Sequence, residues 1–340
     1  MKSIYDLTIP IIQGGMGVGI SKSRLAGAVA KEGAMGTIAS VGIAYGEDDF
    51  YKNAKAADLR ILPQEIAKAK EISEGNGGIA VNIMVATTSY ADMCITAAKS
   101  GADAIISGAG LPLNLPELVA GYDTLIAPIV SSAKALKVVV QHWAKKYGRT
   151  PDFAVIEGPK AGGHLGFKIE DLNTPLENIL KDCVNYLKDV SKNIPLFVAG
   201  GVNTAEKVNF FRSLGAWGAQ IGTRFILTEE CDAHPAFKEK IRSSADENVG
   251  IIKSPVGLPG QAVKNAFFEQ IQKGRIAPKR CVNCLTTCNP ATTHFCICEK
   301  LIQSVKGDAE QGLVFSSAEI GNWNQIVTVK EVLRQCWNPK

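Results

Sequence analysis

The sequence lacks the segments that direct a chain into or across a membrane. Its 340 residues contain no apolar run of the roughly 18 residues that a spanning helix needs, and residues 1–10 hold no apolar signal region. It also lacks a long basic block, because the formal net charge of +4 is spread along the chain. A nucleic-acid footprint requires clustered positive charge. We therefore expect a cytoplasmic protein with no nucleic-acid partner and no membrane partner.

Internal repeats of short period and low-complexity tracts are also missing. The composition is that of a globular protein, with 46% hydrophobic and 21% charged residues, and such a chain buries a large core. Nine cysteines in a chain of this class indicate free thiols, a metal site or redox chemistry rather than a disulfide framework.

Short apolar runs recur along the first two-thirds of the chain. Runs that are apolar on both faces and alternate with amphipathic segments, such as residues 23–32, are typical of parallel strands covered by helices. Eight such strands close a barrel, so the pattern predicts an α/β fold, a (β/α)8 TIM barrel whose active site lies where the strands end. The predicted strands are residues 9–13, 35–39, 79–84, 104–107, 124–130, 153–157, 195–199 and 219–222.

The barrel pattern fades after Arg224. We expect residues 1–229, with a packing segment at 250–275, to form the barrel. Residues 230–249 are expected to be a helical excursion, and residues 276–340 a cysteine-rich C-terminal extension.

One histidine lies in a glycine-rich loop directly after an apolar run. The loop reads EGPKAGGHLGF over residues 157–167. Glycines let the backbone approach a flat ligand closely, and His164 can exchange a proton near neutral pH. The alternative is a connector with a surface histidine, and the rest of the chain must decide between the two.

Two further glycine turns indicate a phosphate site. Gly200 and Gly201 end the seventh predicted strand, and Gly222 and Thr223 end the eighth. Each turn opens toward a helix start, signalled after the seventh strand by residues 203–206, so backbone N–H groups converge on an anion. Turns required only by the fold are the alternative.

The loops at residues 14–17 and 162–163 leave a low-relief surface on which a broad planar ring fits. A phosphate joined to such a ring matches flavin mononucleotide (FMN). Asn82, at the end of the third strand, would hydrogen-bond the polar edge of the ring, unless it only caps a helix. A dinucleotide fingerprint fails because the glycine spacing in residues 15–19 is wrong and no acidic residue follows the second strand.

Taken in order, five motifs carry a specific resemblance to a known family. The chain resembles the FMN-dependent nitronate monooxygenases, formerly called 2-nitropropane dioxygenases, and their close relatives the type II enoyl-ACP reductases. The resemblance covers residues 5 to about 265. The motifs are residues 10–16 (PIIQGGM), 81–84 (VNIM), 161–164 (AGGH), 199–202 (AGGV) and 220–225 (QIGTRF).

This resemblance implies an FMN-binding barrel in which His164 is the catalytic residue that transfers a proton. The chain departs from many relatives at Pro159 and Lys160, because those relatives carry an acidic residue before the AGGH motif. This departure leaves open the polarity near the flavin, and hence the substrate. The implied cofactor-binding residues are Gly14, Gly15, Met16, Asn82, Gly162, Gly163, Gly200, Gly201, Gly222 and Thr223.

Two reactions fit the resemblance. In the expected function, a nitronate monooxygenase, an alkyl nitronate reacts with O₂ to give a carbonyl product and nitrite. In the alternative, an enoyl-ACP reductase, NAD(P)H is the electron donor and an enoyl thioester is the substrate. A flavin- or metal-binding sensor or partner subunit is the non-enzymatic alternative, and assembly as a homodimer stays open.

Five cysteines and one histidine gather in the extension. The first three follow the spacing Cys-x-x-Cys-x-x-x-Cys, which can hold zinc or an iron–sulfur cluster. We predict a metal site with Cys281, Cys284 and Cys288 as ligands. The alternative is a set of buried or reactive thiols. The remaining members of the group are His294, Cys296 and Cys298.

Overall fold

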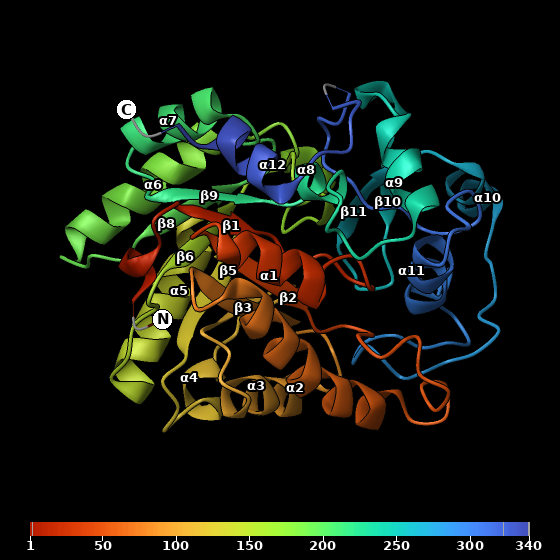
Figure 1. The fold of residues 1–340 in the computed structure, drawn as a ribbon, viewed down its shortest axis with the longest axis horizontal. Coiled ribbons are helices and arrows are strands. Elements are labelled where there is room, and N and C mark those ends of the chain that lie inside the picture. Colours follow the sequence, from red (N-terminus) through yellow and green to blue (C-terminus); the bar gives the residue numbers. More distant parts are fainter. Residues whose placement is uncertain (2, 322, 339–340) are drawn as a thin grey trace.

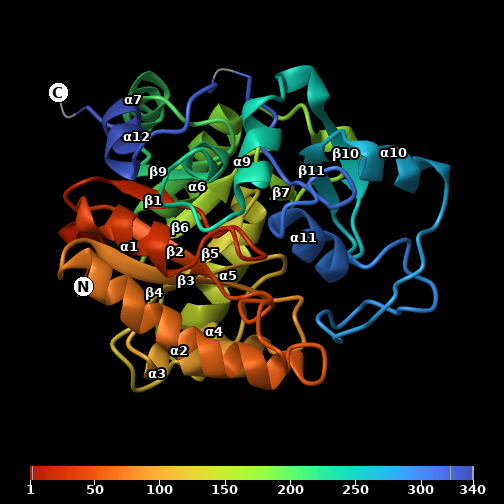
Figure 2. The ribbon, with the colours of Figure 1, turned by 45° about the vertical axis from the view of Figure 1, so that its right-hand side comes forward.

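The computed structural model describes residues 1, 3–321 and 323–338, and it confirms the predicted barrel. Eight parallel strands close in the order β1-β2-β3-β4-β5-β6-β8-β9, with helices around them (Figures 1 and 2). Each of the eight predicted runs overlaps one of them, and the ends differ by at most two residues. The strands are β1 Ile11–Gln13, β2 Met35–Ala39, β3 Gly78–Met84, β4 Ala104–Gly108, β5 Leu125–Val130, β6 Ala154–Glu157, β8 Leu196–Ala199 and β9 Gly218–Ile221.

Large apolar side chains fill the interior of the barrel. Every residue of β2 and β4 is buried, as expected of strands covered on both faces. Inside, the rings of Phe153 and Phe197 meet edge to face with their centroids 5.7 Å apart. Ile4 and Leu7 of the N-terminal segment join the same cluster. Because the interior is packed, a ligand has room only at the ends of the strands.

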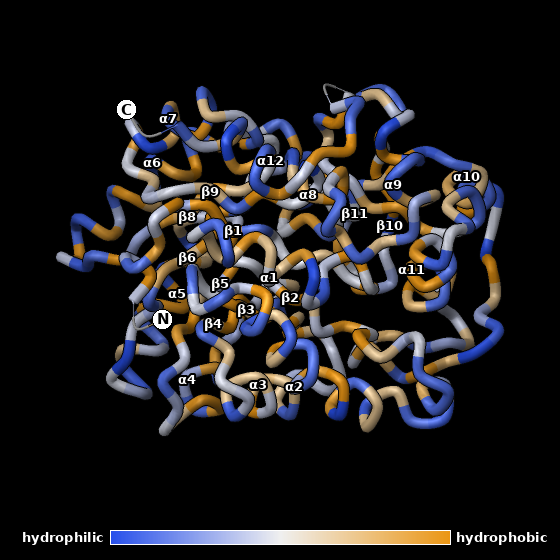
Figure 3. The backbone as a smooth tube through the Cα atoms, in the orientation of Figure 1, coloured by the Kyte–Doolittle hydropathy of each residue, from blue (hydrophilic) through white to orange (hydrophobic). Residues whose placement is uncertain are grey.

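The helices around the barrel each place one face on it. Hydrophobic and hydrophilic residues alternate along the outer helices (Figure 3), which is the pattern of helices buried on one side. None of the helices in the described ranges combines the length and the apolar character needed to span a bilayer. The helices are α1 Ser23–Lys31, α2 Ala54–Ser73, α3 Tyr90–Lys99, α4 Leu115–Leu118, α5 Ala133–Tyr147, α6 Leu176–Asp189, α7 Ala205–Ser213 and α8 Thr223–Ile226.

After β9 the chain returns to the barrel twice. β10 (Val249–Lys253) and β11 (Pro259–Val263) form an antiparallel sheet with β7 (Gly163–His164), the strand inside the predicted histidine loop. Later, α12 (Val329–Cys336) packs against α1, α7 and α8. The other elements of this part are α9 Pro235–Arg242, α10 Ala266–Lys273 and α11 Ile297–Val305. The predicted domain boundaries at 229, 250 and 276 stay predictions.

Candidate active site

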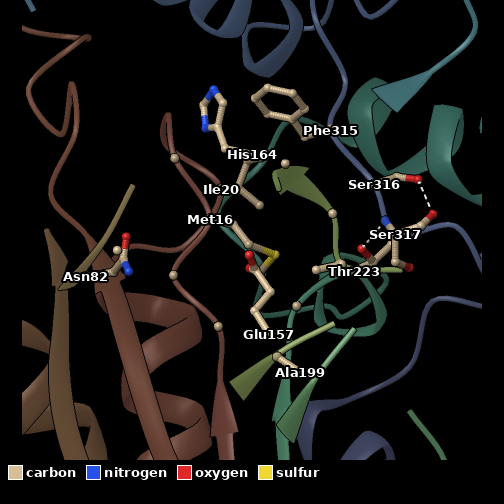
Figure 4. Close-up of a pocket in the computed structure, with 18 of the residues that line it drawn as sticks. Met16, Ile20, Asn82, Glu157, His164, Ala199, Thr223, Phe315, Ser316 and Ser317 are labelled. Atoms are coloured by element: carbon tan, nitrogen blue, oxygen red, sulfur yellow. Dashed lines mark hydrogen bonds between the residues drawn. The ribbon is translucent and has the colours of Figure 1, made fainter. Parts of the chain in front are cut away.

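One cavity opens at the C-terminal ends of the barrel strands, and we call it the rim cavity. Every residue predicted to be catalytic or to bind the cofactor borders it (Figure 4). The segments that contribute them come from β1, β3, β6, β8 and β9 and from the β7 loop. Residues that were not predicted to line this site border it as well: Glu157, Cys284, Cys298, Phe315, Ser316 and Ser317.

The loop after β1 is shaped by buried hydrogen bonds. Gln13 is fully buried, its Oε1 accepts from the Thr37 amide at 2.9 Å, and its Nε2 donates to the carbonyl of Gly14. A Cβ atom on Gly15 would lie only 2.3 Å from the Cβ of Asn82. Glycine at position 15 therefore lets this loop pass directly over Asn82, and it places the two predicted cofactor residues side by side.

The loops after β8 and β9 present backbone donors to the cavity. Gly200 and Gly201 adopt φ angles of +102° and +77°, a backbone conformation that favours glycine. In the described part of the chain, the amides of Gly201 and Gly222 donate to no protein acceptor. The helix that follows β8 is capped by Thr204, whose Oγ1 accepts from the Lys207 amide at 3.3 Å, one residue after the predicted start at Asn203. Free amides at two adjacent loops suit an anionic group.

The C-terminal extension closes the side of the cavity next to these loops. The Ser317 amide donates to the Oγ1 of Thr223 at 2.9 Å (Figure 4). A Cβ atom on Gly162 would lie 2.7 Å from the backbone carbon of Ser316, so the loop and the extension are in close contact there. Sequence reasoning missed this wall because Ser316 and Ser317 lie more than ninety residues after Thr223, and no short-range pattern signals their return.

Lys160, the departure from the family motif, pairs with the extension. Its Nζ donates to the Oε1 of Glu319 at 2.7 Å, and Lys207 contacts the other oxygen of Glu319 while donating to the carbonyl of Gly201 at 2.9 Å. Burial alone would raise the pKa of Glu319, but hydrogen bonds from the two lysines outweigh it and lower that pKa. The extra charge of Lys160 is therefore balanced by Glu319 at the edge of the Gly201 loop.

His164 is held in place by the short sheet. It pairs with Gly260 of β11, its Nε2 lies 2.8 Å from the Oγ of Ser254, and its ring meets Phe315 edge to face at 5.1 Å (Figure 4). Burial lowers the pKa of His164 to about 4. The imidazole is therefore neutral at pH 7, and it can accept a proton from a ligand in the rim cavity.

Glu157 is a titratable residue that the sequence reasoning did not list for the site. It is the last residue of β6 and borders the rim cavity. Desolvation raises the pKa of Glu157 to about 8. A hydrogen bond from the Gly166 backbone lowers this pKa but does not offset the desolvation. At pH 7 most molecules carry a protonated Glu157, which can donate a hydrogen bond or a proton. The sequence contained a signal for this residue, because Glu157 places a carboxyl group at the end of a predicted barrel strand.

Comparison with known proteins identifies the family of this chain. The sequence model described as nitronate monooxygenase matches residues 1–338. The chain belongs to the nitronate monooxygenase family. It is therefore an enzyme of the flavin-dependent oxidoreductase class, as the motifs predicted. A probable nitronate monooxygenase of Bacillus subtilis is 25% identical over 295 residues, which is 78% of this chain and 79% of that protein.

Two solved structures share the fold of this family member. FabK from Thermotoga maritima superposes with a TM-score of 0.77 at 22% identity, covering 98% of this chain and 93% of the other. A nitroalkane oxidase from Streptomyces ansochromogenes gives a TM-score of 0.73 at 16% identity, covering 98% and 95%. At these identities the likeness establishes the barrel and its extension, not the substrate.

The predicted metal centre is not found in this member of the nitronate monooxygenase family. Within residues 1, 3–321 and 323–338, no three His, Cys, Asp or Glu side chains are grouped to hold a metal ion. Cys281 is exposed, while Cys284 and Cys298 of α11 both border the rim cavity. Interaction between the two thiols lowers the pKa of Cys284 and raises that of Cys298. The fold places Cys284 on the same cavity wall as Cys298, a cysteine outside the Cys-x-x-Cys-x-x-x-Cys motif, and Cys281, Cys284 and Cys288 as metal ligands stay a prediction.

Proposed function

We propose that the enzyme binds FMN in the rim cavity and oxidises alkyl nitronates to a carbonyl product and nitrite, with O₂ as co-substrate. One observation supports the proposal most strongly. In a chain of this family, the unpaired amides of Gly201 and Gly222 and the imidazole of His164 border the same cavity. When bound, FMN would supply the electron transfer that no side chain of the cavity can perform.

The residues of the cavity fit such a cofactor. The unpaired amides of Gly201 and Gly222 and the hydroxyl of Thr223 would hold the phosphate. Gly15 leaves a flat surface beside Asn82, whose side-chain amide would hydrogen-bond the polar edge of the ring. The cavity walls thus offer donors at one end and a low apolar surface at the other.

His164 is the proton acceptor in this proposal. A neutral nitroalkane must lose its α proton to become a nitronate, and the neutral imidazole can take that proton while Ser254 fixes the ring. A substrate that arrives as the nitronate anion does not need this step. The protonated Glu157 would donate a hydrogen bond to an oxygen of the ligand.

Protonated Glu157 also favours a second candidate, the reduction of an enoyl thioester with NAD(P)H. That reaction ends with protonation of the α carbon, and a half-buried acid with a pKa of about 8 can deliver a proton near neutral pH. In this case Glu157, rather than the neutral His164, would supply the proton.

Two assays on the FMN-loaded enzyme separate the candidates. Nitrite release from ethyl nitronate or propionate 3-nitronate in air, without NAD(P)H, supports the monooxygenase. Anaerobic oxidation of NADH or NADPH that requires a crotonyl thioester supports the reductase. Failure of the purified protein to bind FMN in a stoichiometric titration would reject both.

A further inference from the structure

Two cavities of the structure share one wall. Beside the rim cavity lies a second cavity of about 460 Å³, which we call the side cavity; polar residues such as Ser40, Lys55 and Thr88 line it. Three residues border both cavities: Val41, Cys284 and Cys298. The partition therefore contains a pair of thiols that a molecule on either side can reach.

The fold fixes each thiol independently. Residues 283–286 lie along the segment after β3: the Thr88 amide donates to the carbonyl of Cys284 at 3.2 Å, and the Thr286 amide donates to the carbonyl of Ala86 at 3.0 Å. Leu285, between them, is buried. Cys298 belongs to the first turn of α11 and is also buried. Two anchored segments thus bring the two cysteines to the same wall, where both border the rim cavity and the side cavity.

The other buried cysteines do not share this arrangement. Cys94, Cys183, Cys231 and Cys336 are buried thiols on helices or in a loop around the barrel, and none borders the rim cavity or the side cavity. They are small apolar residues of the core. The Cys284 and Cys298 pair differs because both residues border the rim cavity and the side cavity.

We propose that Cys284 and Cys298 are a redox-active dithiol that exchanges two electrons with a small-molecule disulfide bound in the side cavity. The Cys284 thiolate attacks one sulfur of the disulfide, forms a mixed disulfide and expels the first thiolate. The Cys298 thiolate then attacks the sulfur of Cys284, forms the Cys284–Cys298 bond and expels the second. The protein dithiol is oxidised, the small disulfide is reduced, and the two protons end on the two released thiols.

The test is a redox titration of the full-length protein as purified. Samples are equilibrated without oxygen in mixtures of glutathione and glutathione disulfide, free thiols are alkylated, and peptides are mapped by mass spectrometry. We expect a crosslink between the Cys284 and Cys298 peptides whose fraction follows the ratio [GSH]²/[GSSG], as an intramolecular disulfide requires. A fraction that follows [GSH]/[GSSG] would mean glutathione adducts on single thiols and would overturn the proposal.

Variants sharpen the result. The C298S substitution should abolish the crosslink and trap glutathione on Cys284, while C94S, a matched loss of a buried core thiol, should leave the crosslink and its midpoint unchanged. If a variant fails to fold, the redox titration of the unmodified protein is a sufficient test on its own. Crosslinks that join Cys284 to Cys281 or Cys288, thiols that stay reduced in pure glutathione disulfide, or stoichiometric zinc or iron on these cysteines would each refute the dithiol.

Discussion

The glycine loops of the rim and the cysteine segment 281–298 border the same cavity, yet the chain builds them in different ways. Each rim loop follows directly from a barrel strand, and its glycines are required by steric contacts such as that between Gly15 and Asn82. The cysteine segment instead depends on a few hydrogen bonds to the residues after β3. A site whose geometry is local can be recognised in a sequence, and a site assembled from distant segments cannot.

Removal of the imidazole should have the largest effect on the rim. H164A should lower kcat/KM for neutral nitroethane by about 10²–10⁴-fold, the usual contribution of a general base. The loss should be much smaller for ethyl nitronate, which has already lost the proton. Steady-state nitrite assays with both substrates measure the difference, and H142A on the outer helix α5 is the control. Equal losses for the two substrates would contradict proton abstraction by His164.

A methyl group at Gly15 should disrupt cofactor binding next most strongly. Its Cβ atom would overlap Asn82, so the loop must move, and we expect G15A to weaken FMN binding by about tenfold or more, a change of about 1.4 kcal/mol. Quenching of FMN fluorescence on titration with apoprotein measures the affinity. A Cβ atom on Gly46 would meet no other atom of the described residues within 4 Å, so G46A is a matched control. An unchanged affinity in G15A would place the ring elsewhere.

The pH dependence of stability should report both buried titratable groups. The pKa of Glu157 is raised to about 8 from 4.5, so the folded apoprotein binds more protons than the unfolded chain and loses stability as pH rises between these values. The pKa of His164 is lowered to about 4 from 6.5, so stability is lost as pH falls through that window. Urea denaturation of the apoprotein measures the free energy of unfolding. In E157Q this free energy should fall less than in the unmodified protein as pH rises toward 8. An unchanged profile would mean that Glu157 ionises freely.

Removal of metal should have the smallest effect, and it probes the cysteine segment. Because no metal site is grouped there in the described residues, dialysis against EDTA should leave Tm within about 1 °C, whereas proteins with structural zinc unfold on chelation. Differential scanning calorimetry before and after dialysis measures it. A drop of several degrees, reversed by zinc but not by magnesium, would restore the predicted metal centre.

Much of the fold was predictable because parallel strands buried on both faces read as continuous apolar runs. Residues 35–39 are one example, and they form β2 with every side chain buried. The rim glycines and His164 were also predictable as lining residues, since they follow directly from those strands. Their chemical roles remain predictions.

The missed features arise from the chain after β9. Ser317 reaches Thr223, Glu319 balances Lys160, and Cys298 pairs with Cys284 only because the extension folds back onto the barrel. The spacing of cysteines along a sequence indicates which thiols are near one another in an extended loop. It does not report a helix such as α11 that brings another thiol closer.

The two-residue strand β7 joins His164 to β11, which is not one of the eight barrel strands. Its backbone is registered against Gly260 and Gln261, while the glycines of β8 and β9 belong to the barrel itself. The position of His164 and the positions of the β8 and β9 glycines are therefore set by different stretches of the chain. Substitutions in residues 259–263 should therefore shift His164 without altering the glycine loops that follow β8 and β9.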